Sequence, residues 1–165
     1  MTVKPINHSY RRRTTGTSLT GGKGMGYVYA EIELTNEEDL ALNRRGYLAD
    51  NEVRKVRSRA LVDSGAWDLV INEAVQKQLN LPVLGRRTVK TADETLLDVE
   101  IVGPVEVRFE DRATTVRAVI IPNTSEVLLG AFPLEGLDAF IDPKRERLLV
   151  NPEDIRPVKQ VSLSI

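Results

Sequence analysis

The segment Asp63-Ser64-Gly65-Ala66 carries the residues in this sequence that are best suited to chemistry. Apolar residues precede it at 60–62 and follow it at 69–71, so the acid is expected on a turn between two buried strands. Gly65 would let a backbone amide approach the carboxylate closely, and the Ser64 hydroxyl could form a lateral hydrogen bond that stiffens the turn. The pattern indicates a carboxylate held in a fixed position, as acid–base catalysis requires.

The rest of the composition disfavours most other catalytic groups. The 165 residues include no Cys and a single His, His8, which lies in a polar N-terminal segment. Thiolate nucleophiles, serine-hydrolase triads and His-rich zinc sites are therefore unlikely classes of site. The glycine-rich stretch at 20–24 lacks the preceding strand and the spacing of a phosphate-binding loop. We expect no cofactor and no metal, and acid–base chemistry carried out by carboxylates, Lys or Tyr.

A single carboxylate cannot both activate a water molecule as a base and protonate a leaving group as an acid. Two facing carboxylates can divide these roles, because two close acids do not both ionise readily and instead share one proton. The sequence contains no second Asp-Ser-Gly or Asp-Thr-Gly. The second acid would therefore come from another copy of the chain across a two-fold axis, so the sequence predicts a homodimer.

Two paired strands are expected to position this turn. Residues 27–34 alternate between polar or aromatic and aliphatic side chains, which is typical of a half-buried strand, and the folded part is expected to start here. A second strand is expected at about 53–62 and runs directly into Asp63. The residues between them form a long polar insertion, 35–52, within one hairpin and without sustained periodicity.

Short helices and further strands complete the expected fold. Asn72 is a suitable N-cap for a helix that continues to Leu79 and is ended by Pro82, and a second short helix is expected around 133–137. The pattern thus predicts an all-β fold with one or two short helices. Its remaining strands, separated by turn signals such as Gly-Pro, are expected near 87–91, 95–102, 105–109, 113–121 and 147–150, and the apolar segment 127–129 precedes the second helix.

This pattern resembles the retropepsin-like (retroviral-type) aspartic proteases, in particular the small bacterial proteins of that clan, over about residues 26–152. The resemblance rests on residues 60–66, on the turn at 91–94 where the tip of the flap hairpin belongs, and on 127–130 before a short helix. It implies a retropepsin-like β-barrel with one lobe per chain. It also implies a homodimeric endopeptidase that acts on peptides or proteins, with water between two Asp carboxylates attacking the peptide carbonyl.

The resemblance assigns roles to individual residues. Asp63 would be the catalytic acid and base, and Ser64 would brace the two loops by a hydrogen bond across the dimer. The loop would be supported by Ser64, Gly65 and Ala66. The flap tip would consist of Thr91, Ala92, Asp93 and Glu94. The residues expected to line the substrate site are Trp67, Asp68, Leu128, Leu129 and Gly130; core packing for the two leucines, and a purely structural role for Trp67, stay open as alternatives.

Three features depart from the family pattern. Trp67 and Ala131 stand where retroviral relatives often have an acid and an Arg, so both halves of an ion pair are absent and no unpaired buried charge remains. The flap tip lacks the glycines of retroviral flaps, so substrate choice cannot be transferred. Ala66 offers no hydroxyl where pepsin-like enzymes have Ser or Thr, so the dyad should keep its proton to higher pH. We expect a pH optimum milder than that of pepsin.

The distribution of charge and the organisation of the chain limit which partners are expected. Five of the 23 basic residues lie in the acid-free residues 1–25, which leaves 18 basic and 24 acidic groups in the rest. We predict a flexible basic tail at 1–25, a protease domain at 26–152 and a C-terminal arm at 153–165. The acidic body disfavours nucleic acid as a ligand. The absence of a long apolar run disfavours membrane insertion and secretion, and favours a cytoplasmic location.

Two other functions stay open at this level. The absent ion pair, the altered flap and the polar insertion also fit a barrel that serves as a dimerisation or peptide-binding module without proteolysis. Such a module would tolerate Asp63→Asn. The cluster Arg11, Arg12 and Arg13 could instead contact nucleic acid, which deletion of residues 1–24 would test.

Overall fold

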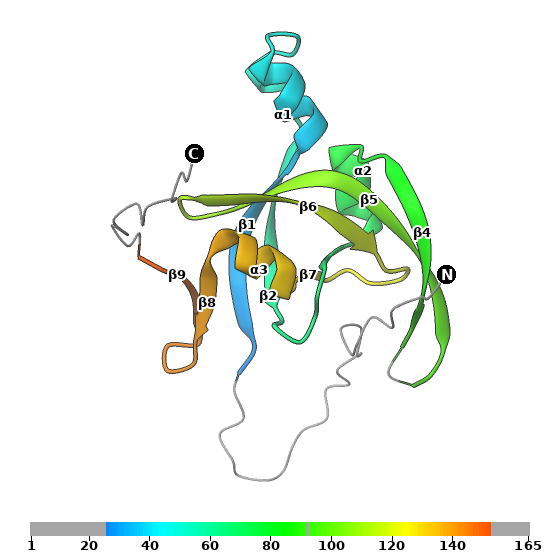
Figure 1. Cartoon of the computed structure of the whole chain (residues 1–165), viewed down its shortest axis with the longest axis vertical. Helices are drawn as coiled ribbons and strands as arrows, with labels where there is room; N and C mark the ends of the chain where they lie inside the picture. Colours follow the sequence, from blue (N-terminus) through cyan, green and yellow to red (C-terminus); the bar gives the residue numbers. More distant parts are fainter. Residues whose placement is uncertain (1–25, 92, 153–165) are drawn as a thin grey trace, which may run out of the picture.

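A computed structural model of the chain describes residues 26–91 and 93–152. The predicted tail at 1–25, the predicted arm at 153–165 and the flap residue Ala92 lie outside the described residues. The described part is mostly β-structure with three short α-helices and one 3₁₀ helix (Figure 1). The all-β class predicted from the sequence is confirmed.

Six strands close into a mixed barrel, and one further strand extends the sheet. The strands are β1 (Val28–Asn36), β2 (Lys55–Val62), β3 (Leu69–Ile71), β4 (Val83–Lys90), β5 (Leu96–Phe109), β6 (Arg112–Ile120), β7 (Val127–Leu129), β8 (Ala139–Asp142) and β9 (Arg147–Val150). Around the barrel the order is β1-β2-β7-β3-β6-β5, and β5 pairs with β1 to close the ring. Strand β4 pairs with β5 outside the ring, and β8 and β9 form a separate two-stranded sheet. This is the single lobe of a retropepsin-like fold.

The barrel interior is filled by the apolar faces of these strands. In β1 the buried residues Val28, Ala30 and Ile32 alternate with more exposed ones, as the sequence predicts. The antiparallel register of β1 and β2 places Val28 opposite Val62. A slip by one residue would turn the apolar face of β2 outward, so burial fixes this register. It therefore also fixes where Asp63, the next residue, leaves the barrel.

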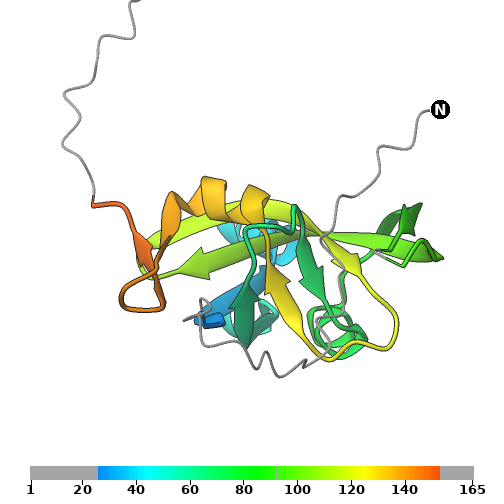
Figure 2. The same cartoon turned by 90° about the horizontal axis from the view of Figure 1, so that it is seen from below.

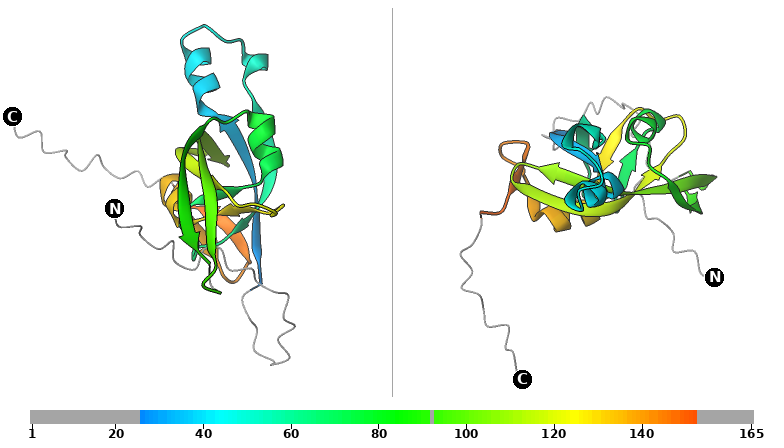
Figure 3. Two further views of the ribbon diagram at one scale, coloured as in Figure 1. Left: turned by 90° about the vertical axis from the view of Figure 1, so that its right-hand side faces the viewer. Right: turned by 90° about the horizontal axis from the view of Figure 1, so that it is seen from above.

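The link between β1 and β2 contains regular structure that the sequence analysis did not predict. It holds helix α1 (Glu37–Arg44) and the 3₁₀ helix η1 (Asp50–Glu52), and it projects away from the barrel (Figure 3). Asn36 caps α1 by accepting a hydrogen bond from the Asp39 N–H at 3.1 Å. Because Asp39 is the only buried residue of α1, its sequence lacks an apolar face, and the cap and acidic first turn stabilise the helix instead.

Helix α2 (Glu73–Leu79) spans the predicted residues. The Asn72 side chain accepts from the Val75 N–H at 2.8 Å, as an N-cap does. Asn80 caps the other end in a left-handed conformation with φ of 48°, so the helix has already stopped two residues before Pro82, the residue predicted to end it. Helix α3 (Ala131–Leu137) starts earlier than predicted and packs against β6 (Figure 2). None of the helices within the described ranges is long and apolar enough to cross a membrane.

The strands around the Gly103-Pro104 step differ from the prediction. The sequence analysis placed a turn there between two strands, but β5 continues through it. The register against β6 shifts between Val102 and Val105, and Gly103 has a φ of 138°. A glycine can absorb such an irregularity as a bulge without reversing the chain, so the Gly-Pro signal was misread. Strand β4 also begins at Val83 rather than near residue 87.

Candidate active site

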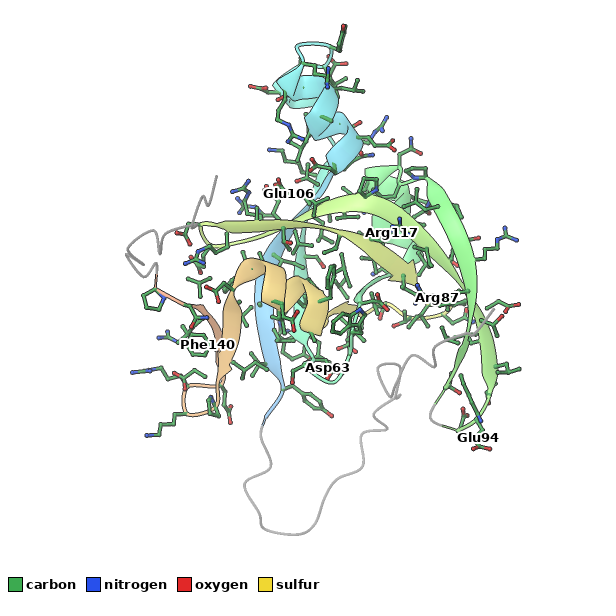
Figure 4. The ribbon with its side chains drawn as sticks, viewed as in Figure 1. Asp63, Arg87, Glu94, Glu106, Arg117 and Phe140 are labelled. Atoms are coloured by element: carbon green, nitrogen blue, oxygen red, sulfur yellow. The ribbon has the colours of Figure 1, made fainter. Side chains whose placement is uncertain are left out.

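Asp63 lies directly after β2, at one end of the barrel (Figure 4). The Gly65 N–H donates to Asp63 Oδ1 at 3.0 Å, and the Ala66 N–H donates to the Asp63 carbonyl at the same distance. The Asp63 N–H donates to the Leu129 carbonyl, also at 3.0 Å. The side chain is half-buried. The carboxylate is therefore oriented by the backbone of its own turn and remains accessible to water.

Strand β7 is what joins the two sides of this turn. It pairs in parallel with β2 and antiparallel with β3, so it fills the space between the strands before and after the Asp63 turn. The side chain of Leu129 has no exposed surface and belongs to the core. Leu128 is half-buried. Of the two leucines expected at the substrate site, Leu129 is therefore a core residue, as the alternative interpretation has it. Its carbonyl group anchors the Asp63 turn through the hydrogen bond from the Asp63 N–H.

Gly130 is where α3 meets the Asp63 turn. A methyl group added at Gly130 would lie 2.7 Å from the carbonyl carbon and oxygen of Trp67 and closer still to the Asp68 carbonyl oxygen. Two backbone hydrogen bonds join the same segments: Ala131 N–H donates to the Ala66 carbonyl at 2.7 Å, and Phe132 N–H donates to the Trp67 carbonyl at 2.9 Å. The absence of a side chain at residue 130 is what allows this approach.

Trp67 lies on the surface rather than in the core. It is 52% exposed, and its ring stacks in a tilted arrangement on Phe132 with 5.5 Å between the ring centroids. Phe132 is itself 47% exposed. The neighbouring residue Asp68 is half-buried. Beside the backbone hydrogen bonds, the turn and α3 are thus also joined by two aromatic rings, one at residue 67 and the other at the residue after Ala131.

The hairpin of β4 and β5 carries the predicted flap tip. The Thr91 N–H donates to the Thr95 carbonyl at 2.8 Å, and Glu94 takes a left-handed conformation with φ of 67°. Hydrogen bonds from the Thr91 hydroxyl, and secondarily from Thr95, hold the pKa of Asp93 below its ordinary value. Glu94 points outward at the end of the hairpin, and none of the tip residues that the structure describes lines the pocket at Asp63 (Figure 4).

Two open pockets adjoin the Asp63 turn on the side of β8. The first is lined by both Asp63 and Ser64, together with Tyr27, Leu61 and Ile141 among others. The second is lined by Ser64, by residues of α3 and by Phe140 and Ile141 of β8. Sequence reasoning did not select these two β8 residues, because an apolar pair in a short strand is usually core. Phe140, however, is 42% exposed.

A third pocket lies on the other side of the turn. Trp67, Asp68 and Phe132 form one wall. The opposite wall comes from β4, β5 and β6, with Arg87, Ile101, Pro104, Thr115, Val116, Arg117 and Val119. Within the described ranges, no group of three or more His, Cys, Asp or Glu side chains is placed to hold a metal ion.

Comparison with known families gives one match. Residues 49–131, half of the chain, match the aspartyl protease family. The matched segment begins before β2, includes the Asp63 turn and the hairpin of β4 and β5, and ends just after Gly130. No curated protein matches the sequence. The family match supports aspartic protease activity in general and a peptide as the class of substrate. The chain belongs to the aspartyl protease family.

Proposed function

We propose that the protein is an aspartic endopeptidase that works as a homodimer, with Asp63 of each subunit as the catalytic pair. The observation that carries this proposal is the fixed, half-buried carboxylate of Asp63 at the end of β2, oriented by the Gly65 N–H at 3.0 Å. The chain has no other Asp-Ser-Gly or Asp-Thr-Gly. One chain therefore supplies only half of an acid–base pair.

The reaction follows from two such carboxylates that share one proton. The ionised carboxylate removes a proton from a water molecule, and the resulting hydroxide attacks the peptide carbonyl carbon. The protonated carboxyl group donates its proton to the carbonyl oxygen. When this tetrahedral diol collapses and the C–N bond breaks, the carboxyl group that took the proton from water gives it to the nitrogen, and one diol hydroxyl returns its proton to the other carboxylate as the C=O bond re-forms. One water and one peptide bond give one carboxylic acid and one amine, and the pair returns to its starting state.

The surface next to Asp63 supports approach by a second copy. Ser64 is exposed and lines both pockets on the β8 side. Phe140 and Tyr27, at 42% and 49% exposure, add apolar area beside it. A two-fold axis near Ser64 would cover these side chains and bring the two Asp63 carboxylates together, because an isologous interface places the same patch on both partners. The bracing hydrogen bond predicted for Ser64 would then form across that axis.

The test is cleavage of a diverse peptide library by the purified protein, between about pH 4 and 8. Asp63→Asn should lower cleavage at least about 100-fold, because it removes the group that transfers protons. Asp111→Asn makes the same exchange at an exposed turn far along the chain and should leave cleavage unchanged. Cleavage that survives in Asp63→Asn would overturn the catalytic assignment. A folded dimer that cleaves nothing would favour the peptide-binding module.

Mixing the two proteins tests the shared site. With the wild-type concentration held constant, a fourfold excess of Asp63→Asn chains should reduce activity to about one-fifth, because most wild-type chains then pair with an inactive partner. The excess should have no effect if each chain acts alone. Analytical ultracentrifugation at the assay concentration gives the oligomeric state in parallel.

The pH profile of the wild type should peak well above about pH 2, the acid range of a pepsin-like dyad.

A further inference from the structure

The pocket lined by Trp67 and Phe132 lies between the candidate catalytic turn and the base of the flap hairpin. Its first wall follows Asp63 within a few residues in the sequence, and its second wall includes Arg87 of β4 and Ile101 of β5. A peptide that lay extended between the Asp63 turn and the hairpin would pass the mouth of this pocket. The pocket is therefore placed to receive a substrate side chain away from the bond that is cleaved.

Two arginines give the pocket a positive character. Arg87 is half-buried and Arg117 is exposed, and they come from the strands on either side of β5 (Figure 4). Neither guanidinium forms an ion pair with another residue in the described ranges, whereas Arg86, the neighbour of Arg87, pairs with Glu100 at 3.7 Å. Asp68 also lines the pocket. Among the described residues that line the pocket, two cations and one carboxylate leave one positive charge in excess.

Apart from Thr115, the other described residues of the lining are apolar. They include the stacked rings of Trp67 and Phe132, together with Ile101 and Pro104. Such a pocket suits a side chain with a short hydrocarbon stem and an anionic end, because the stem contacts the rings while the carboxylate accepts from a guanidinium. Glutamate has both parts. A purely apolar side chain would leave the guanidinium groups facing it without a hydrogen-bond partner, which is unfavourable once water is displaced.

We propose that the pocket formed by Trp67, Phe132, Arg87 and Arg117 selects substrates with an acidic side chain, preferentially Glu, near the scissile bond. This inference rests on the proposed function, since it names the substrate class of the same site. Arg87 and Arg117 are specificity residues and take no part in the proton transfers. Neither the aspartyl protease family match nor the fold assigns this preference.

A binding measurement tests the pocket without relying on catalysis. Trp67 is the only Trp in the sequence, so the intrinsic tryptophan fluorescence of the protein reports on this pocket alone. The probes are short Val- and Ala-based peptides in which a single Glu is moved from position to position, each with a Gln twin. On the uncleaving Asp63→Asn protein, one position of Glu should bind about 5- to 20-fold more tightly than its Gln twin and change the Trp67 emission.

Three substitutions identify the side chains responsible. Arg87→Gln and Arg117→Gln should each bring the Glu peptide close to the affinity of its Gln twin. Arg86→Gln is the matched control: it removes the same charge one residue away, from a side chain that is 78% exposed, and should keep the preference. Thermal unfolding of each variant checks that its fold is intact. The preference should also decline with added salt, because the pocket is partly exposed.

The outcomes separate this inference from the proposed function. The inference is overturned if no Glu position binds more tightly than its Gln twin, if the preference survives in the Arg87→Gln/Arg117→Gln double variant, or if Arg86→Gln removes it equally. Failure of the wild type to cleave any peptide would overturn proteolysis alone, because the Trp67 measurement uses binding. If the wild type does cleave, peptides with Glu at the preferred position should be cleaved with a higher kcat/KM than their Gln twins. Arg87→Gln and Arg117→Gln should each remove this difference.

Discussion

Substitution of Gly130 by Ala tests whether the close contact between the Asp63 turn and α3 holds the site in place. The backbone of Gly130 has an ordinary φ of −84°, so the methyl group brings no conformational penalty of its own. Its cost is steric: three backbone atoms of Trp67 and Asp68 lie under 3.0 Å from the added carbon. Backbone atoms cannot rotate away as a side chain can. The turn and α3 must therefore separate, at a cost of about 1–3 kcal/mol for the overlap.

Separation would also weaken the two hydrogen bonds that join these segments, from the Ala131 and Phe132 N–H groups, at about 0.5–1.5 kcal/mol each. We expect Gly130→Ala to lower the free energy of unfolding by about 2–6 kcal/mol in urea titrations. The control is Gly85→Ala, where no atom lies within 4 Å of the added carbon and the free energy should change by less than about 0.5 kcal/mol. Equal stability of the two variants would refute the steric reasoning.

Two further perturbations test the start of α1 and the tip of the β4–β5 hairpin. Asn36→Ala should lower the free energy of unfolding by about 1–3 kcal/mol, because the buried Asn36 side chain caps α1 through Asp39 and donates to the Leu79 carbonyl at 2.9 Å; an unchanged urea midpoint would contradict this. At the flap tip, the depressed pKa of Asp93 means that its contribution to stability is present above the ordinary value of 3.8 and is lost as pH falls through the lower folded value. In Thr91→Val, NMR titration of Asp93 should shift towards the ordinary value, and an unshifted curve would show that Thr91 is not the main cause.

The central part of the fold could be predicted because its signals are local. The alternation in residues 27–34 identified β1, and the cap at Asn72 identified α2, since each pattern is complete within a few neighbouring residues. The Asp63 turn could be located for the same reason. Helix α1 could not be found by periodicity, because it projects from the barrel and buries only Asp39. The signal that was available was its cap, Asn36, followed by three acids.

The parts that sequence reasoning missed depend on contacts between distant segments. Nothing near Gly103 in the sequence shows that β5 continues past it, because the bulge is defined by the register against β6. The same holds for the third pocket. Arg87 and Arg117 lie thirty residues apart, and only the pairing of β4 and β6 with β5 brings them to one cavity with Trp67. A charged residue in an alternating strand otherwise looks like a solvated surface position.

The two departures from the family pattern at Trp67 and Ala131 are linked through the structure. Relatives with an acid and an Arg at these positions can join the catalytic turn to the following helix by an ion pair. In this chain the same junction is made by backbone hydrogen bonds from the start of α3 and by the stacking of Trp67 on Phe132. None of these contacts carries a net charge, so salt does not screen them. The exchange also leaves a tryptophan ring on the surface beside the turn, where it forms a wall of the arginine-lined pocket. The aromatic pair that joins the turn to α3 is therefore also part of the pocket that we propose takes an acidic side chain.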